Sequence, residues 1–356
     1  MNNLQNMGIS PQVIEETNRF EKYVLGRVLS QAKHIYSVMT EQGEIKAEVS
    51  GKFRFEAQSA IEFPAVGDFV MLNQADDSLG HAVIHRVLSR KSVFIRKAAG
   101  TSQQTQVVAT NVDLVYICMA ANNDFNLRRL ERYLGIAWDS GAKPVIVLTK
   151  SDLSQDLLAQ LSEIETVALG VEVLVTSLDD QVAIGEIKEQ LATGKTAVLI
   201  GSSGVGKSTL INRLLGEEAL ATAGLRNDDK GRHTTTHRQI FALASGGVVI
   251  DTPGMRELGL ESADLDKTFT DIDTLASQCK FNDCSHTSEP KCAVKLAIET
   301  GELSQARYDN YLKLKKEVKY DGLSSRSIEQ VKLNAMFESV GGLKNARKHL
   351  KHRKRK

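Results

Sequence analysis

Short apolar runs separated by polar turns fill the first part of the chain, behind a polar leader. Residues 1–19 show little periodicity, and we expect them to form a loose leader. Behind them come five β-like runs, at residues 23–29, 34–39, 52–55, 68–72 and 82–87. Several short strands broken by turn residues are typical of a small all-β barrel. The pattern therefore predicts a β-barrel domain over residues 20–98.

The third of these runs, KFRF at residues 52–55, alternates cations with aromatic rings. In a strand this alternation places the cations on one face and the rings on the other. A barrel that binds an oligonucleotide could use such a strand for base stacking and phosphate contact. A plain strand with its rings in the barrel core fits the same residues, and we favour that plainer interpretation.

From about residue 107 the pattern changes to strands and helices in alternation. The run VDLVYICM at 112–119 has the continuous hydrophobicity of a strand buried on both faces. Further strands are expected at 144–148, 171–175, 196–200 and 248–250, and helices around 127–138 and 157–167. This alternation predicts a mostly parallel α/β sheet, which we assign to residues 99–262. The following region, residues 263–343, is expected to be mainly helical.

Composition limits the class of protein. With 42% hydrophobic and 25% charged residues among 356, the chain is typical of folded globular proteins, which excludes general disorder and a fibre. Its beginning lacks the apolar segment of a signal peptide, and no apolar run approaches the roughly 20 residues that span a bilayer. The four cysteines then favour a reducing compartment over a disulfide framework. We expect a cytoplasmic protein with no membrane partner.

The net charge of +1 hides an uneven distribution. Residues 344–356 hold eight Lys or Arg, two His and no acid, so residues 1–343 together carry −7. A basic tail of this kind attracts phosphate backbones or anionic lipid. Such a tail is disordered when free, and that is compatible with ordering on RNA.

The sequence GSSGVGKS at 201–208 matches the phosphate-loop pattern G-x-x-x-x-G-K-[ST], between an apolar strand and an amphipathic helix. Glycines let such a loop curl so that its N–H groups point at phosphate oxygens at the positive end of a helix. Lys207 would reach the β- and γ-phosphates, and the Ser208 hydroxyl would ligate Mg²⁺. The residues expected at the phosphates are Gly201, Ser202, Ser203, Gly204, Val205, Gly206, Lys207, Ser208 and Thr209.

A second phosphate-side motif, DTPG at 251–254, follows the strand predicted at 248–250. An acid at the end of a buried strand beside a phosphate loop is placed to hold Mg²⁺ through water, which is the role expected of Asp251. Gly254 would supply an N–H that senses the γ-phosphate. The D-x-x-G pattern is common on its own and gains its meaning from the phosphate loop before it.

The tetrapeptide TKSD at 149–152 fits the [N/T]-K-x-D pattern for guanine recognition. Asp152 would accept two hydrogen bonds from guanine, whereas adenine offers an acceptor at the same place and would be repelled. Lys150 would pack its stem over the base. Ser177, at the next strand end, would contact the guanine carbonyl through its backbone. Helix capping by Ser151 or Asp152 would explain the tetrapeptide alone, but its pairing with a phosphate loop favours guanine.

The motifs stand in an unusual order, with the base-recognition motif before the phosphate loop. A circularly permuted chain can assemble the same site, because domain termini commonly lie close together. With TKSD, GSSGVGKST, GRHTTTHR (231–238) and DTPG in this order, the sequence resembles the RsgA (YjeQ) type of circularly permuted GTPase. The resemblance covers nearly the whole chain. It implies an oligonucleotide-binding (OB) barrel, a GTPase domain and a zinc-binding C-terminal domain.

The same resemblance implies a function. Members of that family mature the small ribosomal subunit late in assembly, with GTP hydrolysis stimulated by the subunit, so the implied partners are that subunit, its rRNA and GTP or GDP. We expect a monomer when the chain is free. Thr149 replaces the more common Asn, which leaves fewer hydrogen bonds to hold the base loop and predicts modest nucleotide affinity.

Residues 231–238 would form the first switch loop of that family. One of three threonines, Thr234, Thr235 or Thr236, should close onto Mg²⁺ and the γ-phosphate, and we favour Thr235. Met255 stands where signalling GTPases carry the glutamine that orients water, and a thioether cannot do that. We therefore expect His233 to position the water, although contact with rRNA or with the loop itself is an alternative.

Three cysteines and a histidine lie within fourteen residues, as Cys279-x₄-Cys284-x-His286-x₅-Cys292. Cys₃His is a sufficient set for a closed, tetrahedral structural Zn²⁺. A disulfide with a spare thiol is the alternative, which a reducing compartment disfavours. Cys118, inside the run at 112–119, is expected to be a core residue.

Two other functions compete with a ribosome-assembly GTPase that hydrolyses GTP with Lys207, His233 and Thr235. One is a nucleotide-independent RNA- or DNA-binding protein with a degenerate GTPase domain, which the intact motifs disfavour. The other is an ATPase or kinase, which Asp152 disfavours.

Overall fold

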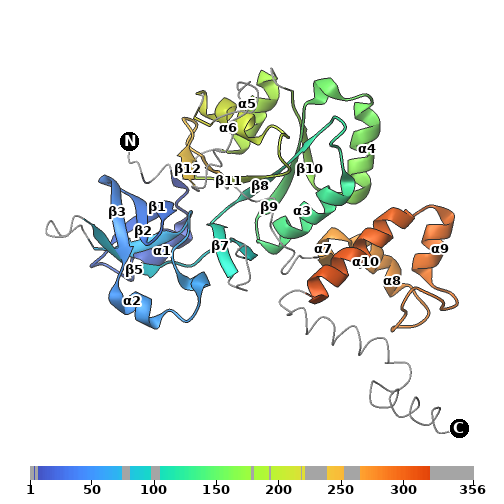
Figure 1. The fold of residues 1–356 in the computed structure, drawn as a ribbon, viewed down its shortest axis with the longest axis horizontal. Helices are drawn as coiled ribbons and strands as arrows, with labels where there is room; N and C mark the ends of the chain where they lie inside the picture. The colour runs from blue at the N-terminus through green and yellow to red at the C-terminus, as the bar shows by residue number, and fades with distance from the viewer. Residues whose placement is uncertain are drawn as a thin grey trace, which may run out of the picture.

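The computed structural model describes most of the chain. The described residues are 4, 7–73, 81–97, 105–177, 180–191, 194–217, 219–220, 239–251 and 265–320. The expected switch loop with His233 and Thr235, Gly254, and the basic tail 344–356 lie outside them. Figure 1 shows the described elements in three groups, with the barrel in blue, the central sheet in green to yellow and the last helices in orange and red.

The first group is a closed five-stranded barrel, as predicted. Its strands follow the order β1-β2-β3-β5-β4, and β4 pairs back onto β1. The β3–β5 pair is parallel and the other pairs are antiparallel. Val28, Val38 and Ile84 fill its interior and are fully buried. The strands are β1 (Val24–Ala32), β2 (Ile35–Thr40), β3 (Gly43–Val49), β4 (Phe69–Leu72) and β5 (Ala82–Val87).

The strand predicted at 52–55 is wrong, in both of its interpretations. These residues belong to the helix α2 (Gly51–Glu56). The remaining strand of the barrel is β3, which was not predicted because its sequence is largely polar. The helix begins because the Ser50 hydroxyl accepts a hydrogen bond from the Phe53 N–H, at 3.0 Å. Phe53 then packs edge-on against Phe63, while Phe55 is 91% exposed. An alternation of four residues is too short to decide between a strand and one helical turn.

The second group is a mixed sheet in the order β10-β9-β8-β11-β13-β12, parallel except for β12. Helices α5 and α6 cover one face and α3 and α4 the other, so the apolar strands are buried on both sides. The strands are β8 (Leu114–Ala120), β9 (Lys143–Thr149), β10 (Glu172–Val175), β11 (Thr196–Ile200), β12 (Gln239–Ala242) and β13 (Val248–Asp251). The helices are α3 (Leu127–Asp139), α4 (Leu157–Val167), α5 (Gln181–Gln190) and α6 (Lys207–Leu215). The predicted α/β sheet is therefore confirmed.

Barrel and sheet are joined through the buried side chain of Arg27 on β1. Its guanidinium donates to the Gly67 carbonyl in the barrel and to the Thr196 hydroxyl at the start of β11, at 3.3 and 3.0 Å. Burial lowers its pKa to about 10, although Asp113 and Asp68 oppose the shift. A single bridge between Ser30 and Gln239 also pairs β1 with β12. The hairpin of β6 (Val93–Lys97) and β7 (Thr105–Thr110) links the two groups along the chain.

The third group is helical and packs against α3 (Figure 1). Phe269 is fully buried here, and its ring meets that of Tyr311 edge-on, at 5.3 Å. Its helices are α7 (Leu265–Thr268), α8 (Thr270–Ser277), α9 (Ala293–Thr300) and α10 (Gln305–Tyr320). The short helices α1 (Pro11–Thr17), η2 (Ala60–Glu62) and η3 (Ser151–Leu153) complete the described elements. Among these residues, every helix falls short of the length and apolarity needed to cross a membrane.

Gly67 offers a test of the junction between barrel and sheet. Its φ is +99°, and a Cβ there would stand 2.2 Å from the Thr110 carbonyl oxygen. Gly67→Ala should therefore destabilise the fold by more than the roughly 1–2 kcal/mol of a left-handed alanine. The measurement is the midpoint of the first urea unfolding transition, followed by circular dichroism.

Gly43→Ala is the matched control, because Gly43 has a φ of +119° and nothing within 4 Å of the added Cβ. Gly43→Ala should therefore lose only the part of the unfolding free energy that the unfavourable backbone conformation costs. Equal losses for the two variants would contradict the tight junction at Thr110.

Candidate nucleotide site and metal centre

The phosphate loop runs from the end of β11 to the start of α6 at the carboxyl edge of the parallel sheet. Gly201 has a φ of +145°, and a Cβ there would lie 2.3 Å from the Cys118 carbonyl oxygen on the neighbouring strand β8. Gly206 caps α6 with a φ of +100°. These glycines let the backbone turn tightly against β8 and lead straight into a helix N-terminus, whose positive end attracts an anion.

Lys207 folds back onto its own loop. Its ammonium donates to the carbonyls of Gly201 and Ser202, at 2.8 and 2.6 Å. Ser208 and Thr209 follow in the first turn of α6 and are partly exposed, as are Ser202 and Gly206. Ser203 and Gly204 are exposed at the tip of the loop, whereas Val205 is buried beneath it. The structure thus brings the predicted phosphate-binding residues together in one loop.

The base-recognition motif lies beside the phosphate loop, although the two are far apart in sequence. The Thr149 hydroxyl donates to the Val205 carbonyl at 2.6 Å, and the Lys150 ammonium donates to the Gly204 carbonyl at 2.7 Å. Lys150 has a φ of +56°, which turns the chain sharply away from β9. The Ser151 N–H donates to the Thr176 carbonyl at 3.2 Å and fastens the motif to the end of β10. Thr149 therefore ties the base-recognition motif at 149–152, the base loop, to the phosphate loop itself.

A cavity of about 230 Å³ opens between these loops. Asp152, Lys150 and Ser177 line it on one side, and Thr209 and Arg213 of α6 on the other. A carboxylate, an alkyl stem and a strand-end backbone are the groups that guanine recognition requires, and they face the same space. Asp251 is the last residue of β13, which pairs with β11, so it lies at the same edge of the sheet as the phosphate loop.

Two site residues were missed by the sequence interpretation. Asp124 and Arg129 follow β8, and the Ser202 hydroxyl bonds both of them: it donates to Asp124 at 2.7 Å and accepts from Arg129 at 2.8 Å. Burial would raise the pKa of Asp124, but the hydrogen bonds from Ser202 and Arg129 lower it overall. For Asp124, in the segment that follows the parallel strand β8, this position was the available signal, whereas Arg129 lies in the first turn of α3 and had no such signal.

The four predicted metal ligands form one cluster. The ligand atoms of Cys279, Cys284, His286 and Cys292 all lie within 4.8 Å of one another. The Sγ atoms of Cys279 and Cys292 are 3.8 Å apart, and His286 Nδ1 lies 3.5 and 3.3 Å from them. The two sulfurs of a disulfide are about 2.05 Å apart, whereas two sulfurs bound to a tetrahedral Zn²⁺, each at about 2.3 Å, lie about 3.8 Å apart. The donor set and its spacing fit zinc, and all four cysteines of the chain are free thiols.

The surroundings act on the thiols of the cluster in opposite directions, because burial raises the pKa of Cys284 to about 11 whereas the pKa of Cys279 is lowered. Cys292 caps α9, and its Sγ accepts from the Lys295 N–H at 3.5 Å. Burial would raise the pKa of Cys279, but the N–H groups of Val294 and Ala293 at the same helix end lower it overall. Cys118, by contrast, is buried in β8, and burial raises its pKa to about 12. It is a core residue, as expected.

The Thr149 contact gives a direct test of the nucleotide site. Thr149→Val removes the hydroxyl and leaves the Val205 carbonyl without this donor, so the affinity for a fluorescent GDP analogue should fall about tenfold, or about 1.4 kcal/mol. Thr149→Ser keeps the hydroxyl and should bind nearly as the parent chain does. Equal affinities for the Val and Ser variants would show that the contact does not support the site.

Comparison with known proteins agrees with this geometry. A family model described as RsgA GTPase matches residues 87–261. The small ribosomal subunit biogenesis GTPase RsgA 2 of Lactiplantibacillus plantarum is 49% identical over 352 residues, which cover 99% of this chain and 98% of that protein. RsgA 1 of Oceanobacillus iheyensis is 46% identical over 301 residues, or 83% of this chain and 86% of the relative.

Two solved structures share the fold. YjeQ from Thermotoga maritima matches with a TM-score of 0.61 and 30% identity, covering 83% of this chain and 98% of that one. YloQ, described as a circularly permuted GTPase, matches with a TM-score of 0.59 and 29% identity over 83% and 95% of the two chains. Phosphate loop, base loop, motif order and relatives agree: the chain belongs to the RsgA family of circularly permuted, GTP-hydrolysing P-loop proteins.

Proposed function

We propose that this GTPase binds the small ribosomal subunit and its rRNA, and acts late in maturation of that subunit with hydrolysis stimulated by it. The observation that carries the proposal is the cavity between the phosphate loop and the TKSD motif, in a chain 49% identical to a small ribosomal subunit biogenesis GTPase. We infer domain limits of 20–98, 99–262 and 263–343, a monomer when free, and action in the cytoplasm.

Within the site, Asp152 would accept from guanine, with Lys150 over the base and Ser177 at its carbonyl. Lys207 would leave the Gly201 and Ser202 carbonyls for the β- and γ-phosphates, a short movement of one flexible side chain. Ser208, Asp251 and Thr235 would hold Mg²⁺, which neutralises charge on the phosphates. His233 would position the attacking water, and Gly254 would sense the γ-phosphate.

The barrel offers a surface suited to RNA. A cavity of about 510 Å³ lies beside α2, and Lys52, Arg86 and His85 are among the residues that line it. His85 stacks on Tyr23 with ring centroids 4.6 Å apart, and Phe55 stands exposed on α2 nearby. Cations with accessible rings are the combination that nucleic-acid surfaces use. The basic tail, outside the described residues, would add phosphate contacts.

GTP turnover with and without purified small ribosomal subunits tests the proposal. We expect stimulation of at least tenfold, GTP bound in preference to ATP, and turnover lost in Lys207→Ala. His233→Ala should lower the stimulated rate at least tenfold while nucleotide affinity stays nearly unchanged, because the histidine acts on water. Unchanged turnover with added subunits would refute subunit stimulation, and an unchanged stimulated rate in His233→Ala would remove its catalytic assignment.

Metal analysis tests the Cys₃His centre separately. The chain should contain one Zn per molecule, and Cys284→Ser should abolish it, because three ligands leave the tetrahedral site open. Cys118→Ala is the matched control and should keep its zinc, since Cys118 lies in β8 of the sheet. Folded protein that contains no zinc would refute the centre.

A further inference from the structure

Helix α3 contacts both the phosphate loop and the C-terminal helices. Its first turn reaches the phosphate loop, because Arg129 donates to the Ser202 hydroxyl at 2.8 Å and to Asp124 at 2.9 Å. Ser202 is the residue whose carbonyl also accepts from Lys207, at 2.6 Å. Arg129 is therefore two hydrogen bonds away from the lysine of the phosphate site, without lining the nucleotide cavity.

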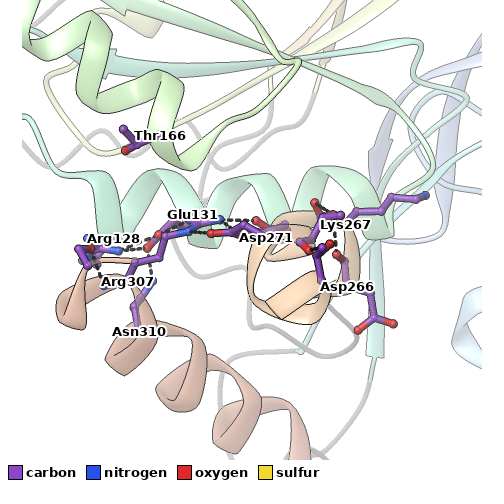
Figure 2. Close-up of polar contacts among 12 residues, drawn as sticks. Arg128, Glu131, Thr166, Asp266, Lys267, Asp271, Arg307 and Asn310 are labelled. Carbon is purple, nitrogen blue, oxygen red and sulfur yellow. Dashed lines mark hydrogen bonds and ion pairs between the residues drawn. The ribbon is translucent and has the colours of Figure 1, made fainter. Parts of the chain in front are cut away.

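Two residues further along, the same helix is anchored in the C-terminal domain (Figure 2). Glu131 is fully buried, and its carboxylate accepts from Arg307 at 2.6 Å and from Asn310, both on α10. Asp271 on α8 binds the other side of the Arg307 guanidinium, with two bonds of 2.7 Å. Arg128 adds a second cation to Glu131 at 2.7 Å.

This cluster is a rigid joint. The Arg307 side chain is 5% exposed, and its guanidinium also lies over the Phe269 ring at 4.8 Å. Asp271 holds the Arg307 guanidinium in one plane through two bonds, and this oriented guanidinium then gives Glu131 on α3 a single bond. A hydrophobic contact alone would let α10 slide along α3. The joint instead fixes the C-terminal domain to the helix whose first turn holds Ser202.

We propose that α3 couples the C-terminal domain to the phosphate loop, with Arg129 as a positioning residue for the loop and Glu131 as the anchor of the domain. A force on α10 would turn α3 and so displace Arg129 from Ser202. The proposal rests on the proposed function, because subunit contact with the C-terminal domain would then reach the nucleotide through this helix. By thermodynamic reciprocity, nucleotide binding must also change the docking of α10.

The test is a double-mutant cycle on the full chain, with the affinity for a fluorescent GDP analogue as the readout. Glu131→Gln should weaken affinity about fivefold and Arg129→Ala about tenfold. The double variant should lose about tenfold, not the fiftyfold expected of independent sites. Arg129→Lys should restore part of the loss.

The matched control is Glu317→Gln. Glu317 pairs with Arg132 at 2.5 Å and joins the same two helices, but both side chains are about a third exposed (35% and 32%), whereas Glu131 is fully buried. This variant should bind GDP as the parent does. If Glu131→Gln also binds as the parent does, or if the two losses multiply, the coupling is refuted.

A second measurement needs no variant. Hydrogen exchange of α10 should slow when GDP binds the parent chain, and this response should disappear in Glu131→Gln. Folding of that variant is expected because Arg307 keeps Asp271 as its counterion, and its zinc content checks this. Unchanged exchange at α10 in the parent chain would overturn the proposal.

Both measurements are made without ribosomal subunits. Absence of subunit stimulation would therefore refute the proposed function and leave the coupling standing. Losses of affinity that multiply in the double variant would refute the coupling alone.

Discussion

The nucleotide site depends on the parallel alignment of β9, β8, β11 and β13, because parallel strands present their carboxyl ends at one edge. That edge brings Thr149, Ser202 and Asp251 together from three separate parts of the sequence. The hydrogen bond from the Thr149 hydroxyl to the Val205 carbonyl, at 2.6 Å, then fastens the base loop to the phosphate loop. Thr149 replaces the asparagine that is more common at this position, and its hydroxyl makes this contact directly, while the modest nucleotide affinity predicted from the replacement stays a prediction. The two loops proposed to bind the base and the phosphates of one nucleotide consequently support each other.

Permutation of the chain leaves this edge intact and changes what is attached to it. Each strand needs only its neighbours, so the order of motifs along the chain does not enter the geometry of the site. In this chain the barrel lies against β12 and β11, where Arg27 reaches Thr196. The helices that come after β13 in the sequence pack on α3. The barrel therefore contacts the nucleotide-binding sheet directly, whereas the C-terminal helices contact it through α3.

Features encoded by neighbouring residues could be predicted from the sequence, and features that depend on distant residues could not. The strands at 144–148 and 196–200 were predictable because burial on both faces demands unbroken apolar runs. The run at 52–55 was misread because four alternating residues also fit one helical turn, and the Ser50 cap decided for the helix. The strand β12 (Gln239–Ala242) is short, and it forms because β13 and β1 lie on either side of it. The pairing of Glu131 with Arg307 spans 176 positions, and no local pattern encodes it.

The pair of Glu131 and Arg307 is the contact that folding stability alone explains least well. Removing charged groups from water is costly, and well-packed apolar residues often stabilise a contact as much as a buried ion pair does. A joint made only for stability would need neither Arg307 nor the second carboxylate of Asp271. Apolar surfaces tolerate sliding, whereas a guanidinium held between two carboxylates has one orientation. In the proposed coupling, the cluster sets the angle between α3 and α10, because a set angle is what two domains need if movement of one is to be felt by the other.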